Sequence, residues 1–121
     1  MNETQPPITY RLCLEGDFPA LAAFYEELDE FFRTLEYRLP KPENAGQAWI
    51  DSFRRTLGRF SQVHIAEMNG EIVGFMLSRI KRTPIYFGGV LVGELSDMII
   101  LPQARRRGVG ERLSRMGIEW M

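Results

Sequence analysis

The segment from Asp97 to Leu113 constrains the fold more than any other part of this chain. Its first residues, Met98 to Leu101, favour a β-strand, and Pro102 ends that strand. A basic turn with glycines at positions 108 and 110 follows. After the first glycine, apolar residues recur at a helical interval, at Val109, Leu113, Met116 and Trp120. The segment therefore predicts a strand, a glycine turn and an amphipathic helix in direct succession.

A turn of this composition is suited to binding an anion. Glycines let the backbone approach a ligand and direct N–H groups toward it, and the positive end of a helix dipole adds to the attraction. Two other phosphate-binding loops fit less well, because Leu113 stands where a dinucleotide fingerprint has its third glycine and no Gly-Lys-Ser/Thr follows. We therefore predict phosphate binding at this turn, without a Rossmann or P-loop arrangement.

The turn resembles the signature of the GNAT superfamily of acyl-CoA-dependent N-acyltransferases. The matching pattern is Arg105-x-x-Gly108-x-Gly110, placed after Ile100 and Pro102. Residues 8–21 and the hairpin of residues 65–75 resemble the family too, in the same order, so the resemblance covers nearly all 121 residues. It implies an α/β (α+β) fold in which helices flank a mixed, mostly antiparallel sheet.

Length and composition predict one globular domain over residues 1–121. With 45% hydrophobic and 26% charged residues the chain can bury a single core, but it is too short for two domains. A net charge of −1 argues against nucleic-acid binding over a broad surface. Cys13 is the only cysteine, which excludes an internal disulfide and a cysteine-based zinc cluster. We expect a soluble cytoplasmic protein, because the sequence contains neither a long apolar run nor a signal peptide. We expect no bound metal.

The rest of the chain predicts two helices before the central strands. A strand over residues 8–14 is followed by a helix that Asp17 caps, with Pro19 in its first turn. Its apolar stripe comprises Leu21, Phe24, Leu28, Phe31, Phe32 and Leu35. The segment Leu39 to Pro42 breaks the pattern. A second helical interval then follows at Ala45, Trp49, Phe53, Leu57 and Phe60.

Asn69-Gly70 predicts a tight turn between antiparallel strands over residues 63–68 and 71–80. A connection over residues 81–89 leads to a fourth strand over residues 90–101. Alternation along that strand assigns its side chains to two faces of the sheet. One face has Glu94, Ser96, Met98 and Ile100, and the other has Leu95, Asp97, Ile99 and Leu101.

The last helix reaches Met121 in helical register, without a capping glycine or asparagine. Members of the family usually continue through a fifth strand, a fourth helix and a closing hairpin. The resemblance therefore implies the N-terminal two-thirds of an acyltransferase domain, truncated after its third main helix, whose general acid lies beyond the chain end and which is inactive as a fragment. A complete minimal domain is the alternative. An exposed fourth strand also predicts a homodimer.

The activity that the resemblance implies is transfer of an acetyl group from acetyl-CoA to an amine of a small molecule or peptide, by direct attack. The alternative is a non-catalytic CoA-binding or interaction module. The CoA pyrophosphate would meet backbone N–H groups of the turn, and the pantetheine arm would lie beside the fourth strand. The residues implied to bind CoA are Met98, Ile99, Ile100, Arg105, Arg106, Arg107, Gly108, Val109 and Gly110. Without the surrounding pattern, the three arginines are a solvated basic turn.

Glu94 is the preferred general base, and Asp97 is the second candidate. Aminoglycoside-type members of the family carry a glutamate at the position of Glu94, and polyamine-type members carry one at the position of Ser96. The alternative for Glu94 is a carboxylate at a strand end that is solvated or paired with a neighbouring arginine. Tyr86 and Phe87 would border the acceptor amine, unless they serve only packing. The acceptor itself cannot be read from the sequence.

Overall fold

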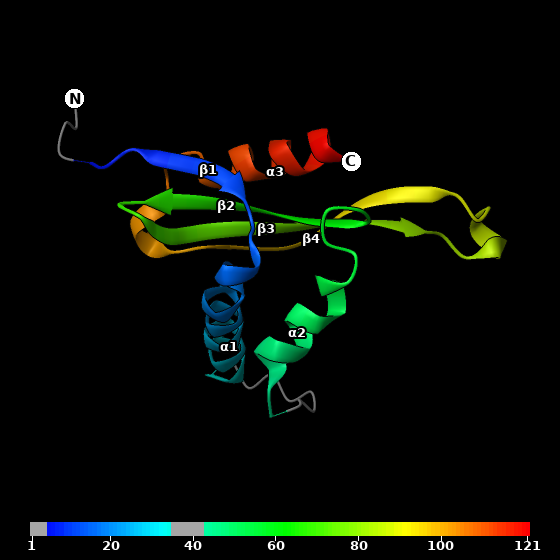
Figure 1. The fold of residues 1–121 in the computed structure, drawn as a ribbon, viewed down its shortest axis with the longest axis horizontal. Helices are drawn as coiled ribbons and strands as arrows, with labels where there is room; N and C mark the ends of the chain where they lie inside the picture. Colours follow the sequence, from blue (N-terminus) through cyan, green and yellow to red (C-terminus); the bar gives the residue numbers. More distant parts are fainter. Residues whose placement is uncertain (1–4, 35–42) are drawn as a thin grey trace. The chain divides into compact units, whose positions relative to one another are not determined.

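The fold consists of two compact units, which are described separately (Figure 1). The structure is a computed structural model that describes residues 5–34 and 43–121, with side chains described for 5–28 and 43–121. The first unit comprises Met1–Cys13 and Thr56–Met121, and the second comprises Leu14–Arg55. The first unit holds a β-sheet and one long helix, and the second holds two helices.

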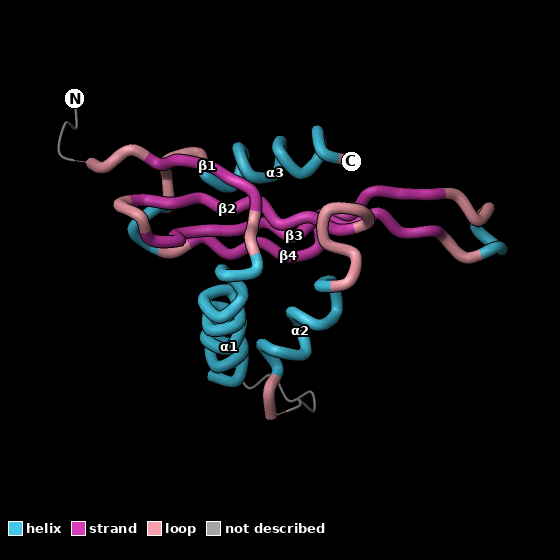
Figure 2. Tube along the Cα trace, in the orientation of Figure 1, coloured by secondary structure: helices cyan, strands magenta, loops and turns pink. Residues whose placement is uncertain are grey.

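Four strands form the sheet of the first unit in the order β1-β2-β3-β4 (Figure 2). The strands are β1 Ile8–Leu12, β2 Ser61–Met68, β3 Glu71–Arg82 and β4 Leu91–Ile100. Each neighbouring pair is antiparallel. The expected mixture of parallel and antiparallel pairs is therefore wrong for the described strands. Strand β4 has a neighbour on only one side within the described part of the chain, so its outer edge presents unpaired backbone groups.

Two hairpins determine the register of the sheet. Asn69 and Gly70 have φ values of 56° and 77°, which confirms the predicted tight turn between β2 and β3. Strands β3 and β4 form a long arm that extends past the other two strands (Figure 1). The short 3-10 helix η2, Ile85–Phe87, forms the tip of this arm. The predicted connection over residues 81–89 starts too early, because β3 continues to Arg82 and pairs there with Leu91.

Helix α3, Val109–Trp120, covers one face of the sheet. Its buried residues are Val109, Leu113 and Gly117. The first two belong to a core cluster with Ala66, Val73, Met76 and Ala104. Met116 and Trp120, predicted on the same stripe, are only half-buried. The helix comes closest to the sheet at Gly117 instead. A Cβ at that position would meet the Ser78 hydroxyl and would lie 3.0 Å from Cδ2 of Leu95, so only glycine allows this approach.

The second unit contains the 3-10 helix η1, Glu15–Asp17, followed by α1, Phe18–Thr34, and α2, Ala45–Arg54. Pro19 lies in the first turn of α1, as predicted. Asp17 ends η1 and directly precedes α1, and its carboxylate accepts a hydrogen bond from the backbone N–H of Leu14 at 2.7 Å. Its role as the cap of α1 stays a prediction.

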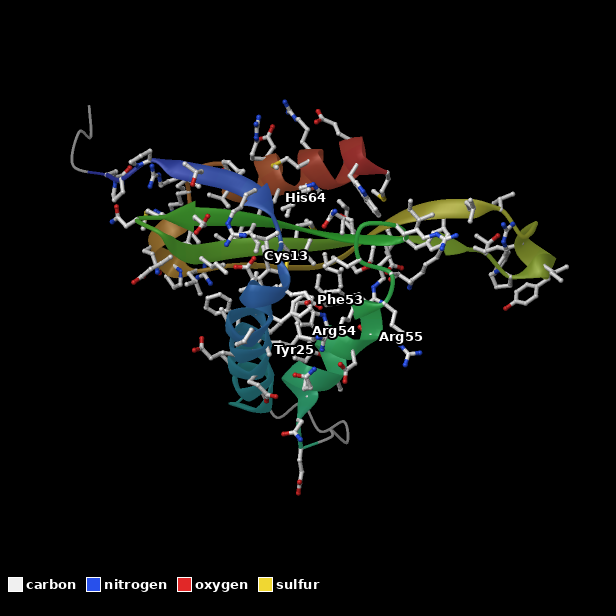
Figure 3. All side chains as sticks on the ribbon, viewed as in Figure 1. Cys13, Tyr25, Phe53, Arg54, Arg55 and His64 are labelled. Atoms are coloured by element: carbon white, nitrogen blue, oxygen red, sulfur yellow. The ribbon has the colours of Figure 1, made fainter. Side chains whose placement is uncertain are left out.

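The two helices of this unit pack through a glycine and four aromatic rings. The backbone N–H of Gly46 donates to Oε1 of Glu26 at 2.6 Å, and a Cβ at position 46 would lie 2.5 Å from the Ala22 carbonyl oxygen. Trp49 stacks on Tyr25 at 5.1 Å between ring centroids, and Phe53 meets the edge of Phe18 at 6.2 Å. Figure 3 labels Tyr25 on α1 and Phe53 on α2.

Some predicted helix residues are corrected, and others are not described. Leu57 and Phe60 lie outside α2, which ends at Arg54, and Gly58 adopts a φ of 86° in the turn that follows. Leu21 is fully buried, while Phe24 and Leu28 are half-buried. The side chains of Phe31, Phe32 and Leu35, and the breaker Leu39 to Pro42, lie outside the described residues. No helix in the described part of the chain is long and apolar enough to span a membrane.

His64 is a buried polar residue on the face of the sheet that α3 covers. It pairs across β2 and β3 with Met76, a member of the core cluster under α3, and only 5% of its surface is exposed. Figure 3 labels His64 between the sheet and α3. Its Nδ1 has no hydrogen-bond partner among the described residues. Burial lowers the pKa of His64 below its ordinary value of 6.5, because the charged imidazolium is poorly solvated there.

We predict that His64 makes the fold acid-sensitive. The pKa is lower in the folded than in the unfolded chain, so the unfolded chain binds the proton more tightly. The free energy of unfolding should therefore be unaffected by His64 above a pH of about 7, and should fall as the pH decreases below about 6.5. Urea unfolding between about pH 7 and pH 5 measures this.

His64→Leu is the informative variant, since His64 is the only histidine in the sequence. It should show a smaller loss of stability over the same pH range. Equal pH slopes for the two proteins would contradict the prediction.

Candidate functional site

The candidate site is centred on β4 and the turn that follows it. Strand β4 pairs regularly with β3 at both ends, but the register shifts in the middle: Leu77 pairs with Asp97, and Ser78 pairs with Leu95. Ser96 is therefore an extra residue in β4, as in a β-bulge. Bulges bend a strand and redirect its side chains.

The bulge changes which residues share a face. Residues opposite each other in adjacent strands lie on the same face, so the partner on β3 gives the face of each β4 residue. Leu95, Met98 and Ile100 pair with Ser78, Met76 and Gly74. All three of these β3 residues lie against α3: Met76 shares a core cluster with it, a Cβ at Gly74 would lie 3.5 Å from Cγ1 of Val109, and a Cβ at Gly117 would meet the Ser78 hydroxyl. This set therefore faces α3. Glu94, Asp97 and Ile99 pair with Arg79, Leu77 and Phe75, and lie on the opposite face.

The predicted alternation is thus wrong beyond Leu95. It grouped Glu94 with Met98 and Ile100, whereas the register groups Glu94 with Asp97 and Ile99. Simple alternation assumes one residue per pleat, and the extra residue Ser96 breaks this assumption. The consequence for chemistry is that both candidate bases, Glu94 and Asp97, lie on one face.

Glu94 is held by two side chains. The Lys81 Nζ lies 3.0 Å from Glu94 Oε1 and donates to Oε2 at 3.1 Å, and the Ser96 hydroxyl donates to Oε1 at 2.7 Å. The Glu94 side chain remains 43% exposed, so it is accessible to a ligand. The hydrogen bond from Ser96, followed by the one from Lys81, lowers the pKa of Glu94. Glu94 is therefore ionised at neutral pH and can accept a proton.

The turn after β4 positions unpaired backbone donors. A 3-10 helix, η3, Pro102–Ala104, leads into Arg105, and Arg106 then adopts a left-handed φ of 63°. Gly108 has a φ of 76° and forms the N-cap of α3 without a side-chain hydrogen bond. The first intrahelical hydrogen bond runs from Arg112 N to Gly108 O. The N–H groups at positions 109–111 therefore have no intrahelical acceptor and, with the helix dipole, favour an anion.

The three arginines of the turn have different surroundings. Arg105 donates from Nε to the Ile100 carbonyl at 3.1 Å and is exposed. Arg106 is exposed as well. Arg107 is half-buried, and its guanidinium donates to the Pro6 carbonyl at 2.7 Å and contacts Met68 Sδ at 3.4 Å. Arg107 therefore ties the turn to the chain before β1, while Arg105 and Arg106 face solvent.

The two signature glycines have different roles. Gly108 has the positive φ that glycine favours, and a Cβ there would meet no atom within 4 Å. A Cβ at Gly110 would lie 3.1 Å from Cδ1 of Ile100 and 3.4 Å from Cε of Met98. Gly110 therefore allows α3 to approach β4 closely, and its role in opening the turn to a ligand stays a prediction. Val109 is buried in the core, so only its backbone can reach a ligand.

Tyr86 and Phe87 lie at the tip of the β3–β4 arm. Their side chains pack on each other at 4.8 Å between centroids, and the residues are 81% and 70% exposed. Glu94 pairs with Arg79, three pairs before the last strand pair, Arg82 with Leu91. The tip therefore lies about 10 Å or more beyond Glu94, on the side away from the phosphate turn.

Two residues of the site, Lys81 and Gly117, and the bulge at Ser96 were missed by the sequence analysis. Lys81 was assigned to a loop. It lies two residues after Arg79 on β3, and Arg79 pairs with Glu94 on β4. A basic residue at this spacing is a signal for an ion pair with Glu94. Gly117 and the bulge at Ser96 carry no clear signal, because each depends on how α3 and β3 fit against neighbouring residues. Within the described part of the chain, no group of three His, Cys, Asp or Glu residues could hold a metal ion.

The overall fold is similar to that of known acetyltransferase structures. A predicted acetyltransferase from Clostridium acetobutylicum, solved with acetyl-CoA, matches with a TM-score of 0.69 and 18% identity over 93% of this chain and 75% of its own. The aminoglycoside 6'-N-acetyltransferase AAC(6')-IG from Acinetobacter haemolyticus matches with a TM-score of 0.66 and 15% identity, over 93% and 70%. At such low identity, these TM-scores establish a common fold and nothing more.

A third match is AAC(6')-Iy in complex with the bisubstrate analogue CoA-S-monomethyl-acetylneamine. Its TM-score is 0.65 with 18% identity, and the match covers 94% of this chain and 71% of the other. No curated protein sequence matches this chain. The sequence profile of the Acetyltransferase (GNAT) family, however, matches residues 21–121. The chain belongs to the GNAT acetyltransferase family.

The contacts of Glu94 generate a direct test. Ser96→Ala removes the hydrogen bond that contributes most to the lowered pKa, so the pKa of Glu94 should rise. Carbon-13 NMR titration of the glutamate carboxyl groups measures it. The matched control is Ser52→Ala, because the Ser52 hydroxyl donates to the Trp49 carbonyl in the other unit. An unchanged pKa in Ser96→Ala would show that the hydroxyl does not hold the carboxylate.

Proposed function

We propose that this chain is an N-acetyltransferase that moves the acetyl group of acetyl-CoA to an amine of a small molecule or peptide. Acetyl-CoA is the usual co-substrate of the GNAT family to which the chain belongs. The observation that carries the proposal is the turn between β4 and α3, whose helix N-terminus lacks a side-chain cap and is preceded by exposed Arg105 and Arg106. Such a turn suits the pyrophosphate of CoA.

The binding proposal assigns different parts of the turn to different tasks. The backbone N–H groups from Gly108 onward would donate to the pyrophosphate, and the exposed guanidinium groups of Arg105 and Arg106 would add charge. Arg107 would contribute only its backbone, because its side chain already donates to the Pro6 carbonyl. The outer edge of β4 at Met98, Ile99 and Ile100 would offer its backbone groups to the amide groups of the pantetheine arm.

The chemical proposal is direct attack of a neutral amine on the thioester carbonyl. Glu94 would accept the proton that the amine nitrogen loses, directly or through water. Its ionised state at neutral pH supports this role, although a lowered pKa makes it a weaker base than an unperturbed glutamate. Asp97, on the same face, is the second candidate.

A CoA-binding module without catalysis is the second candidate function. The observation that favours it is the ion pair between Glu94 and Lys81. The ammonium group of Lys81 lies where the acceptor amine would have to approach the proposed base. Acetyl transfer to a panel of amines separates the two functions. The panel should include aminoglycosides, because AAC(6')-IG is an aminoglycoside acetyltransferase, as well as polyamines, amino acids and peptides.

Two further proposals, the acceptor contacts and a homodimer, are based on side chains that are exposed to solvent. Tyr86 and Phe87 would contact an acceptor that extends past Glu94 toward the tip of the arm. A homodimer would form along β4, whose open edge carries the exposed side chains of Leu91, Val92, Leu95 and Met98. Light scattering over a range of concentrations tests the dimer.

The first prediction of this proposal concerns the turn. Gly108→Val places a β-branched residue at a φ of 76°, which costs about 1–2 kcal/mol and distorts the donors. The dissociation constant for CoA should rise by about tenfold or more, as measured by calorimetry. Arg106→Ala should have a smaller effect.

The matched control for this prediction is Gly58→Val. Gly58 has a φ of 86° and equally open surroundings, but it lies in the turn before β2. It should lose stability without losing CoA affinity. Equal CoA affinity in Gly108→Val and in the unaltered protein would refute the proposed phosphate turn.

The second prediction concerns proton removal. Glu94→Gln keeps the shape of the side chain and removes the base, so kcat should fall by about a hundredfold while CoA affinity changes little. The loss should be largest at lower pH, where the amine is protonated. Asp97→Asn is the comparison, and a larger loss of kcat in this variant would move the role of base to Asp97.

A further inference from the structure

Lys81 is an amine held against the proposed catalytic base. Its Nζ lies 3.0 Å and 3.1 Å from the two carboxylate oxygens of Glu94. Both side chains are about half exposed, at 50% and 43%, so neither is sealed in the core. The chain contains only one other lysine, Lys41. The ammonium group of Lys81 thus occupies the position next to Glu94 that an acceptor amine would need.

The position of Lys81 along the sheet is compatible with an acetyl donor bound at the turn. Glu94 precedes Ile100, the last residue of β4, by six residues, which corresponds to about 20 Å of extended strand. An extended pantetheine arm that starts at the turn and follows the edge of β4 has a comparable length. Its thioester end would therefore come to the level of Glu94, and Lys81 reaches Glu94 from the adjacent strand β3.

We propose that Lys81 is a self-acetylation site, whose Nζ receives the acetyl group of acetyl-CoA bound to the same chain. This inference rests on the proposed acetyltransferase function. The neutral Nζ attacks the carbonyl carbon of the thioester, a C–N bond forms and the C–S bond breaks. Glu94 takes the proton that the nitrogen loses, and CoA leaves as its thiol after gaining a proton from solvent.

Acetylation of Lys81 changes the state of Glu94. An N-acetyl-lysine is neutral, so the ion pair between the two side chains is lost. The Ser96 hydroxyl still donates to Oε1, and the carboxylate becomes available to an external ammonium group. Self-acetylation therefore removes the Lys81 ammonium group, which competes with the acceptor amine for Glu94. The Glu94 carboxylate is then free to serve as the base for an external amine.

The main experiment incubates the purified protein with acetyl-CoA and no acceptor, and follows Lys81 by peptide mass spectrometry. A synthetic peptide of residues 77–85, incubated without protein, contains Lys81 as its only lysine and measures its uncatalysed reactivity. Lys81 in the protein should be acetylated at least about tenfold faster than in the peptide, and faster than Lys41. The fraction modified per unit time should not depend on protein concentration, because the transfer is intramolecular.

Glu94→Gln separates catalysis from chemical reactivity. If Lys81 reacted passively, loss of the carboxylate would make its neutral amine easier to form and acetylation would rise. Acetylation assisted by Glu94 should instead fall in this variant. Gly108→Val should reduce it as well, because the donor binds less tightly. Acetylation of Lys81 that rises in Glu94→Gln, that equals the peptide rate, or that increases in proportion to protein concentration would overturn the proposal.

A measurement without an acetyl donor tests the consequence for Glu94. Lys81→Gln imitates the neutral acetylated side chain, so the pKa of Glu94 should rise relative to the unaltered protein. An unchanged pKa would refute the effect of the modification on Glu94. Transfer to external amines in the same samples distinguishes the two proposals: external transfer without Lys81 acetylation rejects only self-acetylation, and absence of both rejects the acetyltransferase function too.

Discussion

Two glycines let helix α3 lie close against the sheet, and the geometry of the candidate site depends on this close packing. Gly110 brings the first turn of the helix onto Ile100 and Met98, and Gly117 brings the third turn onto Ser78 and Leu95. Side chains at these positions would push the helix away from β3 and β4. The close approach holds the helix N-terminus at the end of β4, where its unpaired N–H groups can meet a phosphate.

The bulge in β4 has a comparable effect on the chemistry. It turns Glu94 and Asp97 to the face opposite α3, and the extra residue Ser96 donates to Glu94. Lys81 on β3 completes the surroundings of that carboxylate. Ser96 and Lys81 both stabilise the ionised form, so a group that is exposed enough to meet a ligand is also kept ready to accept a proton.

Much of this fold could be predicted from local patterns. The Asn69-Gly70 hairpin, Pro19 in the first turn of α1 and the strand–turn–helix segment around Gly108 are confirmed. Family membership, inferred from the turn and its spacing, is confirmed by the match over residues 21–121. The end of α2 was predicted wrongly, because a turn in which Gly58 has a φ of 86° follows the helix there.

The sequence by itself determined the features that depend on near neighbours in the chain: turn glycines, helix stripes and the basic signature before α3. The tertiary structure alone decided the register shift at Ser96, the ion pair between Lys81 and Glu94, and the use of Arg107 to bind the Pro6 carbonyl. The register shift, the ion pair and the hydrogen bond of Arg107 each involve residues from different segments of the chain. Their positions follow from the pairing of whole strands and the packing of α3, which local periodicity does not encode.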